Sequence, residues 1–237
     1  LMALADDTGQ VFLADMTQNQ VVASLEHDEP VTYLAFNHEG TALATYTQAS
    51  ELVIWEQAGE TWSVRGRVQE DPSVMAFTNG VAWGVNGEPL TFHGRQVYFY
   101  EGETATVVNF SFDISRIAAA PTQQTLVLYS YGDAVTTHST IYFWDVRGRQ
   151  LFGEVSTQFS GDSLALSPDE QTVVVSGQLG SVGFEGELDF DPYTTLYTVG
   201  LPFWQAQACT LVNRNLSEAE WAEIMPPSEP YALTCSE

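Results

Sequence analysis

Lysine is absent from this sequence of 237 residues, and basic side chains of any kind are few. Seven arginines stand against 31 aspartates and glutamates, which gives a formal net charge of −24 at pH 7. Nucleic-acid binding needs clustered cations, and an anionic membrane surface repels so acidic a chain. Charge therefore argues against both. The excess of carboxylates leaves three interpretations open: a solvated surface that aids solubility, a basic protein partner, or adaptation to high salt.

Long apolar stretches are missing too. No apolar run approaches the ~18 residues of a membrane-spanning helix, so this segment is not expected to insert into a membrane. The first seven residues have neither a basic start nor a long apolar core, so they do not read as a signal peptide. They read as part of a strand, and we expect the chain to begin inside a larger protein.

Motifs of common catalytic chemistry are also missing. The sequence has no nucleophile elbow, no P-loop and no dinucleotide-binding fingerprint. The glycine-rich residues 177–183 are not followed by a predicted helix, so they do not suggest a phosphate cradle. Four histidines are scattered along the chain and lie far from both cysteines in sequence: His27, His38, His93 and His138. No catalytic residue and no cofactor is predicted.

Only two cysteines are present, Cys209 and Cys235, both near the C-terminus. One interpretation is a disulfide that pins the C-terminal segment, which in the chain-entropy model adds about 3 kcal/mol. It would imply an oxidising compartment. The other interpretation is a pair of reduced, buried thiols. A metal site is not indicated here, because no histidine or further cysteine lies at ligand spacing.

What the sequence does contain is a repeated aromatic strand end. The clearest copy is residues 141–145, Ile-Tyr-Phe-Trp-Asp, which follows a run of hydroxyl residues. Its Trp144 has counterparts at Ala14, Trp55, Tyr100 and Tyr197, so that successive spacings are 41, 45, 44 and 53 residues. About 40–45 residues is the period of a four-stranded propeller blade. The last spacing carries an insertion.

Each period has the same order of strands and turns. In the second unit an alternating strand precedes the turn at residues 37–40, and a second strand leads to the strand end. The first strands of the second to fifth units are expected at residues 31–36, 74–77, 114–118 and 163–166. Helical periodicity is absent until about residue 202. The pattern predicts an all-β chain built from four-stranded units.

These features resemble a WD-repeat β-propeller. The family has a Gly-His pair before the first strand, where Glu26 and His27 stand here, and an Asp six residues before the Trp. The second position holds Thr8, Ala49, Gly94, His138 and Asp191 in the five units, so only Asp191 matches. The resemblance implies that the family's buried Asp-His-Ser/Thr-Trp network is mostly missing. Apolar packing around Trp55 and Trp144 would then hold the blades, with His138 making a structural hydrogen bond.

The blade count is incomplete. The first unit enters at its second strand, so residues 1–200 hold about 4.5 blades. Most rings of this family have seven. We therefore expect an incomplete seven-bladed ring with two or three blades upstream in the same polypeptide, because an open end exposes blade faces. Residues 201–237 are expected to form a helical tail packed on the propeller.

Two helices are predicted in this tail. Residues 201–212 have a proline near a helix start and apolar positions three and four apart. Ser217 and Glu220 have the spacing of a capping box, in which the serine accepts from the amide of Glu220 and the carboxylate reaches back. Leu216 and Trp221 are placed to staple this second helix.

The tail resembles the closing segment of many large bacterial WD-repeat signalling proteins. The match runs through Cys209, Arg214-Asn215-Leu216-Ser217, Glu220-Trp221, Tyr231 and Cys235. In that family the propeller follows an effector module such as a STAND-type NTPase, a protein kinase or a caspase-like protease. A membrane span often separates the two. The resemblance implies an extracytoplasmic location if Cys209 and Cys235 are oxidised, and a cytoplasmic one otherwise.

The insertion in the fifth unit is unusually acidic. Glu185, Glu187, Asp189 and Asp191 alternate with other residues, so in a strand they would share one face. One interpretation is a calcium site, since calcium favours several carboxylate oxygens. A second is a contact arm for a basic partner. A third is a protruding hairpin whose solvated acidic edge blocks edge pairing.

These observations favour a non-catalytic propeller that binds protein or senses a ligand, as part of a bacterial multidomain regulator. Propellers present loops on a rigid ring, and such loops carry binding sites. An enzyme that uses the central channel is the alternative, but the predicted first strands carry almost no acid or base residues. A third possibility is a structural stack of blades that mediates self-assembly.

Overall fold

The structure is a computed structural model of the chain. It describes residues 1–237 except 72–79, 132–138, 158–162, 183–187, 200–213, 216, 225–230, 232, 234 and 236–237. For residues 178–182, 188–193 and 222–224 it describes the backbone alone. None of the described helices is long and apolar enough to cross a membrane.

Five antiparallel sheets make up the described strands, and each is one blade. Blade 1 comprises β1 (Met2–Ala5), β2 (Gln10–Asp15) and β3 (Gln20–Glu26). Blade 2 comprises β4 (Val31–Phe36), β5 (Ala42–Thr47), β6 (Glu51–Ala58) and β7 (Thr61–Gln69). Blade 3 comprises β8 (Gly80–Trp83), β9 (Pro89–His93), β10 (Gln96–Glu101) and β11 (Thr104–Asn109). Blade 4 comprises β12 (Arg116–Ala120), β13 (Thr125–Ser130), β14 (Thr140–Asp145) and β15 (Gln150–Ser156). Blade 5 comprises β16 (Ser163–Leu166), β17 (Thr172–Val182) and β18 (Leu188–Thr198).

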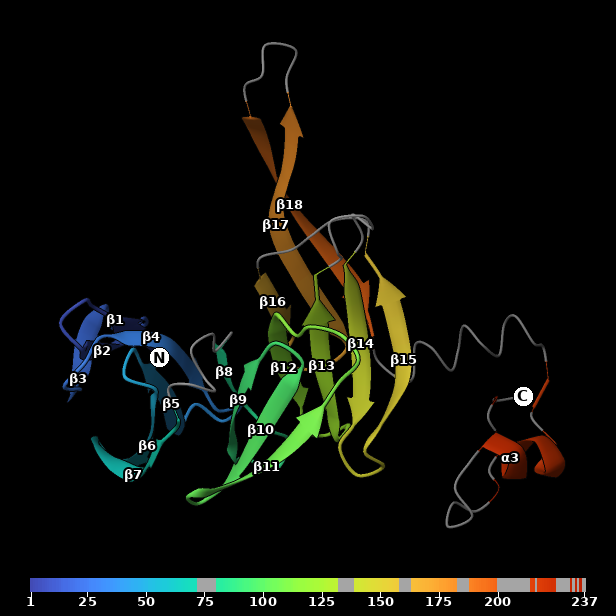
Figure 1. Cartoon of the computed structure of the whole chain (residues 1–237), viewed down its shortest axis with the longest axis horizontal. Coiled ribbons are helices and arrows are strands. Elements are labelled where there is room, and N and C mark those ends of the chain that lie inside the picture. The colour runs from blue at the N-terminus through green and yellow to red at the C-terminus, as the bar shows by residue number, and fades with distance from the viewer. Residues whose placement is uncertain are drawn as a thin grey trace.

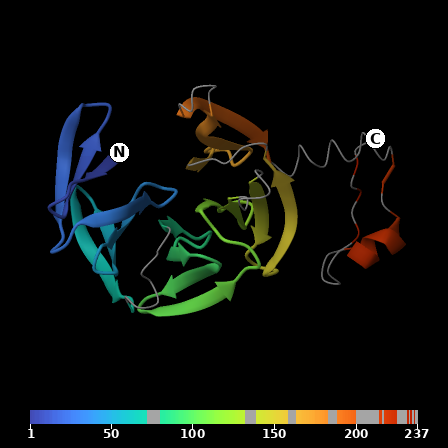
Figure 2. The same ribbon diagram turned by 45° about the horizontal axis from the view of Figure 1, so that its top comes forward.

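The blades follow one another around a common centre as an open arc (Figures 1 and 2). Blade 1 and blade 5 form the two ends of the arc, and Figure 2 shows that they do not meet. Among the described residues, blades 2, 3 and 4 each have four strands, blade 1 begins at the second strand position, and blade 5 ends at the third. The predicted fold class is confirmed: the chain is all-β, with the blades of an incomplete propeller.

Polar side chains fix the turns between first and second strands. In blade 2, Asn37 Oδ1 accepts from the backbone N–H of Thr41 at 2.8 Å and of Ala42 at 2.9 Å. Gly40 closes this turn in the left-handed region at φ +71°. Ser167 has the same role in blade 5, where its Oγ accepts from the backbone N–H of Thr172 at 2.9 Å. The predicted turn at residues 37–40 is therefore built by its own side chains.

Buried apolar side chains join each blade to the next. There are four such clusters among the described residues, one for each pair of successive blades. Each contains residues of both blades, for example Leu13 and Trp55, Tyr46 and Trp83, Leu90 and Trp144, and Tyr129 and Val175. Fully burying one large apolar side chain contributes about 1.5–3 kcal/mol. Because every cluster draws on two blades, a blade is held mainly by its neighbours.

One strand prediction was wrong. The first strand of the third unit was expected at residues 74–77, but the first described strand of blade 3 is β8, which begins at Gly80 and pairs with β9. Residues 74–77 lie outside the described residues. The short sequence Gly-Val-Ala-Trp does not alternate in polarity, because Val81 and Trp83 face blade 2 whereas Ala82 packs toward blade 4. Because both faces of β8 are buried, its sequence lacks the alternation of polar and apolar residues that predicts a strand.

The capping box is present in the one described helix, α3 (Glu218–Ile224). The backbone N–H of Glu220 donates to Ser217 Oγ at 3.3 Å, and the N–H of Ser217 donates to the Glu220 carboxylate at 2.8 Å. The predicted helix at residues 201–212 lies outside the described residues, as does Leu216. The boundary at residue 200 and the packing of the tail on the propeller remain predictions.

Candidate functional site

Three hydrogen-bonded residues link the end of β3 to blade 2. The Trp55 indole N–H donates to Thr45 Oγ1 at 3.1 Å, and Thr45 Oγ1 lies 3.2 Å from His27 Nε2. The His27 ring also packs edge-on against Trp55. Burial lowers the pKa of His27, and the Arg67 charge adds to this. The His-Thr-Trp part of the WD-repeat network is therefore present in this blade, although only its apolar packing was expected.

In the same blade, the residue at the family's Asp position has no side-chain hydrogen-bond acceptor. Ala49 stands there, and the second ring nitrogen of His27, Nδ1, is buried without a hydrogen-bond partner among the described residues. An unpaired buried polar atom costs about 1–3 kcal/mol. The network of blade 2 is thus complete except for one residue.

Glu70 takes the equivalent place between blades 2 and 3. Its carboxylate accepts from Tyr46 Oη at 2.7 Å, from Thr91 Oγ1 at 2.9 Å and from the Tyr100 hydroxyl. Burial raises the pKa of Glu70, and the hydrogen bonds from Tyr46 and Thr91 oppose that rise. Sequence comparison with the family pattern misses this site, because a glutamate replaces the histidine and a tyrosine replaces the tryptophan.

The same place is apolar in blade 4. Phe110 follows β11 and is therefore equivalent to His27, which follows β3. Leu128 is equivalent to Thr45, because Leu128 pairs with Tyr142, two residues before Trp144, as Thr45 pairs with Val53, two residues before Trp55. The Phe110 and Trp144 rings meet edge-to-face with centroids 5.8 Å apart. Among the described residues of this blade, apolar packing around Trp144 fills the place that the hydrogen bonds have in blade 2, while the predicted hydrogen bond of His138 stays a prediction because His138 lies outside the described residues.

The same backbone hydrogen bond occurs at each of these joints between blades. The residue after each fourth strand donates its N–H to the carbonyl of the residue before a third strand: His27 to Gly9 at 3.0 Å, Glu70 to Ser50 at 3.0 Å, Phe110 to Arg95 at 2.8 Å, and Thr157 to Ser139 at 2.7 Å. The backbone geometry therefore repeats, while the side chains that fill it differ. These residues lie at the joints between blades, and none of them lines the two cavities described next.

A cavity at the centre of the arc is the first candidate for binding. It has a volume of about 250 Å³ and is lined by turns and first strands of blades 2 to 5, including His38, Glu39, Gly87, Pro121 and Leu166. His38 and Glu39 are exposed at its rim. The strands β4, β8, β12 and β16 carry one charged residue, Arg116, and no Asp, Glu, His or Cys. Among the described residues this cavity holds no set of convergent acids and bases.

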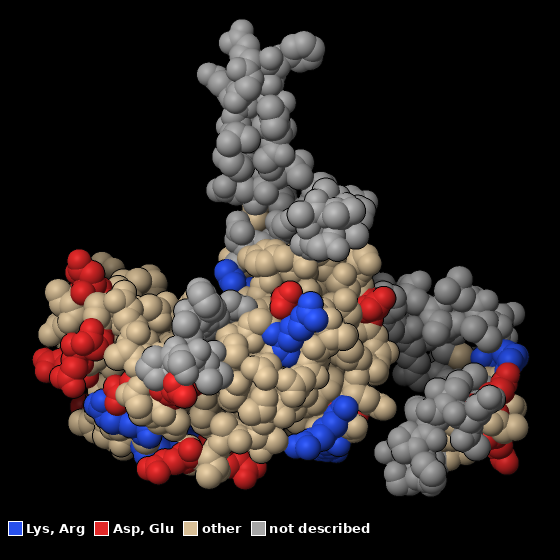
Figure 3. Space-filling view, in the orientation of Figure 1, with Lys and Arg blue, Asp and Glu red and all other residues tan. Residues whose placement is uncertain are grey.

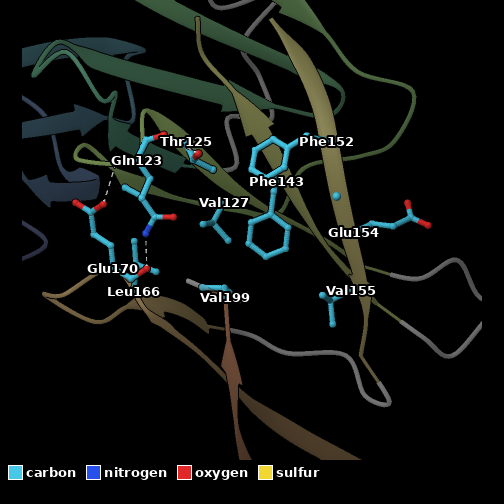
Figure 4. A pocket seen from close by; sticks show the side chains of 12 residues that line it. Gln123, Thr125, Val127, Phe143, Phe152, Glu154, Val155, Leu166, Glu170 and Val199 are labelled. Atoms are coloured by element: carbon cyan, nitrogen blue, oxygen red, sulfur yellow. Dashed lines mark hydrogen bonds between the residues drawn. The ribbon is translucent and has the colours of Figure 1, made fainter. Parts of the chain in front are cut away.

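A second cavity of about 280 Å³ lies between blades 4 and 5 (Figure 4). Val127, Phe143, Phe152 and Val155 form its wall on blade 4, and Leu166 and Val199 border it on blade 5. Figure 4 shows the Phe143 and Phe152 rings on one side and the hydrogen-bonded pair of Gln123 and Glu170 at one end. It is smaller than the ~300–1,000 Å³ that drug-sized ligands occupy, so it fits one or two apolar side chains.

Glu170 belongs to the joint between these blades and not to a reactive site. Its carboxylate accepts from the backbone N–H groups of Thr122 at 3.1 Å and Gln123 at 3.2 Å, and from the Thr122 hydroxyl. Its backbone carbonyl accepts from Gln123 Nε2 at 2.7 Å. With its acceptors engaged, Glu170 fixes the turn of blade 4 against the turn of blade 5.

The acidic insertion forms a long hairpin. Register pairs Asp189 with Ser181 and Asp191 with Leu179, on the part of the β17–β18 ribbon that projects from the blades (Figure 1). Glu185, Glu187 and His138 lie outside the described residues. The described part of the chain contains no group of three or more His, Cys, Asp or Glu that could hold a metal. The calcium interpretation remains a prediction.

The residues of the tail motif are one another's partners. Arg214 pairs with the Glu220 carboxylate at 2.6 Å, and the Trp221 ring meets Tyr231 edge-to-face at 5.8 Å. Asn215 Oδ1 accepts from the backbone N–H of Cys235 at 2.6 Å. Side-chain bonds to Arg214 and Ser217 lower the pKa of Glu220. The described residues of this motif therefore contact one another around α3, and we call them the tail unit.

Cys235 is not a free thiol. Its predicted partner, Cys209, lies outside the described residues. The Cys209–Cys235 disulfide therefore stays a prediction.

Charge is distributed unevenly along the chain. Residues 1–64 contain ten aspartates and glutamates and no lysine or arginine. On the face drawn in Figure 3, carboxylates gather over the N-terminal blades and along the lower rim, while arginines stand singly or in small groups. Some arginines pair locally: Arg67 with Glu51 at 3.0 Å, and Arg65 with Glu88 between blades 2 and 3. Such exposed pairs contribute about 0–1 kcal/mol each.

The fold defines this chain as an open β-propeller, and three solved structures are similar to it. Hydrazine synthase from Kuenenia stuttgartiensis matches with a TM-score of 0.61 at 12% identity, over 82% of this chain and 58% of that one. The mitotic checkpoint complex matches with 0.54 at 15% identity, over 84% and 61%. The β-propeller domain of Cps50 (Swd1) from Myceliophteria thermophila matches with 0.56 at 12% identity, over 81% and 67%.

At these identities the likeness establishes the propeller fold alone. The chain spans less than two thirds of the hydrazine synthase and checkpoint-complex chains that it matches. No family model matches the sequence. No curated protein matches it either.

Proposed function

We propose that this chain is a non-catalytic protein-interaction module that binds its partner over the central cavity. The observation that carries the proposal is the meeting of turns from blades 2 to 4 and the end of β16 at one cavity, whose described lining has no convergent acids and bases. Rigidly held turns suit binding, and catalysis would need placed proton donors and acceptors. Exposed His38 and Glu39 at the rim provide polar contacts.

A basic protein is the partner that the charge favours. The net charge of −24 and the cation-free first 64 residues would attract a basic surface and raise its association rate. The two small volumes, about 250 and 280 Å³, favour side chains of a protein over a larger ligand. Ligand sensing is the less favoured form of the same proposal, and no observation on the described residues favours an enzyme.

We place the chain in the C-terminal part of a bacterial multidomain regulator. The resemblance of the tail motif supports this, and so does the open face of blade 1. On that face Leu4 is 52% exposed and Met2 is 36% exposed, while Val11 and Leu13 on the other face are fully buried. Upstream blades of the same polypeptide would cover the exposed face. Cys209 and Cys235 would form a disulfide if this part of the regulator lies in an oxidising compartment.

A photo-reactive amino acid at His38, introduced into the parent protein in its own cells, tests the proposal. We expect light to link that position to a separate protein. The matched control is the same amino acid at Val107, which is exposed on the outer strand β11. Equal adducts at both positions, or none at His38, would contradict binding at the central cavity.

A further inference from the structure

The cavity between blades 4 and 5 has a structural cause. In blades 2, 3 and 4 the third strand is covered by a fourth strand, but blade 5 ends at β18 among the described residues. In blade 2 the fourth strand carries Trp62, which packs on the cluster between blades 1 and 2 and meets Phe36 edge-to-face at 6.1 Å. The corresponding place beside blade 5 is the cavity, so it lacks one outer element.

The walls of this cavity are those of an unfinished interface. Phe143 is 7% exposed and packs in the cluster between blades 4 and 5, whereas Phe152 on the outer strand is 48% exposed. Their ring centroids are 6.0 Å apart (Figure 4). Gly153 leaves the floor open, because a Cβ there would meet Phe143 at an ordinary 3.6 Å. An apolar element with an aromatic side chain would complete this packing.

The chain itself supplies a segment of this kind at the required place. Residues 201–212 begin two positions after Val199, which borders the cavity. They contain no charged residue, in a chain that is 16% charged, and they include Phe203 and Trp204. After this segment the described chain resumes at Arg214 and α3. Starting point and composition therefore agree with the cavity.

We propose that residues 201–212 dock in the cavity between blades 4 and 5, with an aromatic side chain against Phe143 and Phe152. A second copy of the chain is a poorer occupant, because two copies with a net charge of −24 each repel one another. The proposal does not rest on the proposed partner, which binds at the other cavity.

The docked segment would also anchor the tail unit. Residues 201–212 include Cys209, and the tail unit contains Cys235 together with Arg214 and α3. Docking would hold the segment, and with it the tail unit, beside blade 5. The interblade cavity would then be occupied from within the chain, which leaves the central cavity as the place for a separate protein.

The test uses the full chain with Phe152→p-benzoylphenylalanine, an aromatic replacement at a half-exposed site. We expect irradiation of the monomer to give an adduct within the chain, and mass spectrometry of its peptides to place the link in residues 201–212. Adding Gly153→Leu, which fills the cavity, is expected to lower the adduct yield at least tenfold. As a control, the same analogue at Val107 is expected to give no link to this segment.

Four results would overturn the proposal. They are a covalent dimer, a link to a segment outside residues 201–212, no adduct, or an adduct yield that Gly153→Leu does not change. Circular dichroism of each variant confirms that the propeller is folded. A failure here leaves the His38 experiment unaffected, so the two proposals fail separately.

Discussion

His27 and Glu70 occupy equivalent positions in consecutive interblade joints, with the same backbone hydrogen bond and opposite chemistry. His27 is a buried base next to Thr45, and Glu70 is a buried acid next to Thr91. Burial favours the neutral form of both groups, since it lowers the pKa of His27 and raises the pKa of Glu70. The fold thus tolerates different polar groups at this joint, provided that each finds hydroxyl partners.

Ala49→Asp is expected to stabilise the protein. The new carboxylate would stand where the family has its Asp and would accept from the orphaned His27 Nδ1. We expect a gain of about 1 kcal/mol in the free energy of unfolding, measured in urea. The same substitution in a His27→Gln background serves as the control and should give no such gain. Equal gains in both backgrounds would show that the histidine is not involved.

Glu70→Gln is expected to flatten the dependence of stability on pH. A raised pKa in the folded state means that Glu70 favours folding at low pH, and that this contribution is lost as pH rises through the folded pKa. Stability of the parent chain should therefore fall relative to the variant as pH increases above about 4.5, the ordinary value for glutamate. Urea unfolding from pH 4 to 8 measures the difference, and parallel profiles would refute the assignment.

Leu128→Thr is expected to destabilise blade 4, although threonine is the residue that blade 2 has at this position. The Trp144 indole N–H can donate to the new hydroxyl, as Trp55 donates to Thr45 in blade 2, but Phe110 cannot replace His27, and the smaller threonine loses apolar contacts that Leu128 makes in the surrounding cluster. Each buried CH₂ group that is lost costs about 0.8 kcal/mol, so we expect a loss of about 2 kcal/mol. Thermal unfolding measures the loss, with exposed Val107→Thr as the control. An unchanged melting temperature would contradict the apolar description of this joint.

Glu220→Gln is expected to loosen α3. Hydrogen bonds to Arg214 and Ser217 lower the pKa of Glu220, so its contribution is present at neutral pH and is lost only as pH falls through the folded pKa. The variant keeps the shape and removes the charge. We expect faster amide exchange at Trp221, whose N–H donates to the Ser217 carbonyl at 2.9 Å. Exposed Glu218→Gln is the control and should have less effect.

The predicted disulfide can be measured by mass. If Cys209 and Cys235 are bonded, the chain without reductant is two hydrogens lighter than the reduced chain and takes up no alkylating agent. Two alkylated thiols in the native protein would reject the disulfide and favour the cytoplasmic alternative. Fresh protein from the natural host avoids oxidation during purification.

The sequence predicted the number and period of the blades, with one strand misplaced, but not the joints between them. The aromatic strand ends at Trp55 and Trp144 place the third strands correctly, because their period is fixed by the four-stranded unit. The role of Glu70 could not be read from the sequence, since its partners Tyr46 and Tyr100 come from different blades. The interblade cavity was equally hidden, because it arises from an outer strand that blade 5 lacks among the described residues.

The most direct test of the account is the affinity of the partner captured at His38. The variant His38→Arg changes the exposed rim of the central cavity and leaves in place the hydrogen bond that Glu39 accepts from Asn37 Nδ2. We predict that it weakens binding of that purified partner to the parent protein at least tenfold, while Val107→Ser on the outer strand leaves the affinity unchanged. An unchanged affinity in the rim variant would contradict the claim that this propeller binds protein over its central cavity.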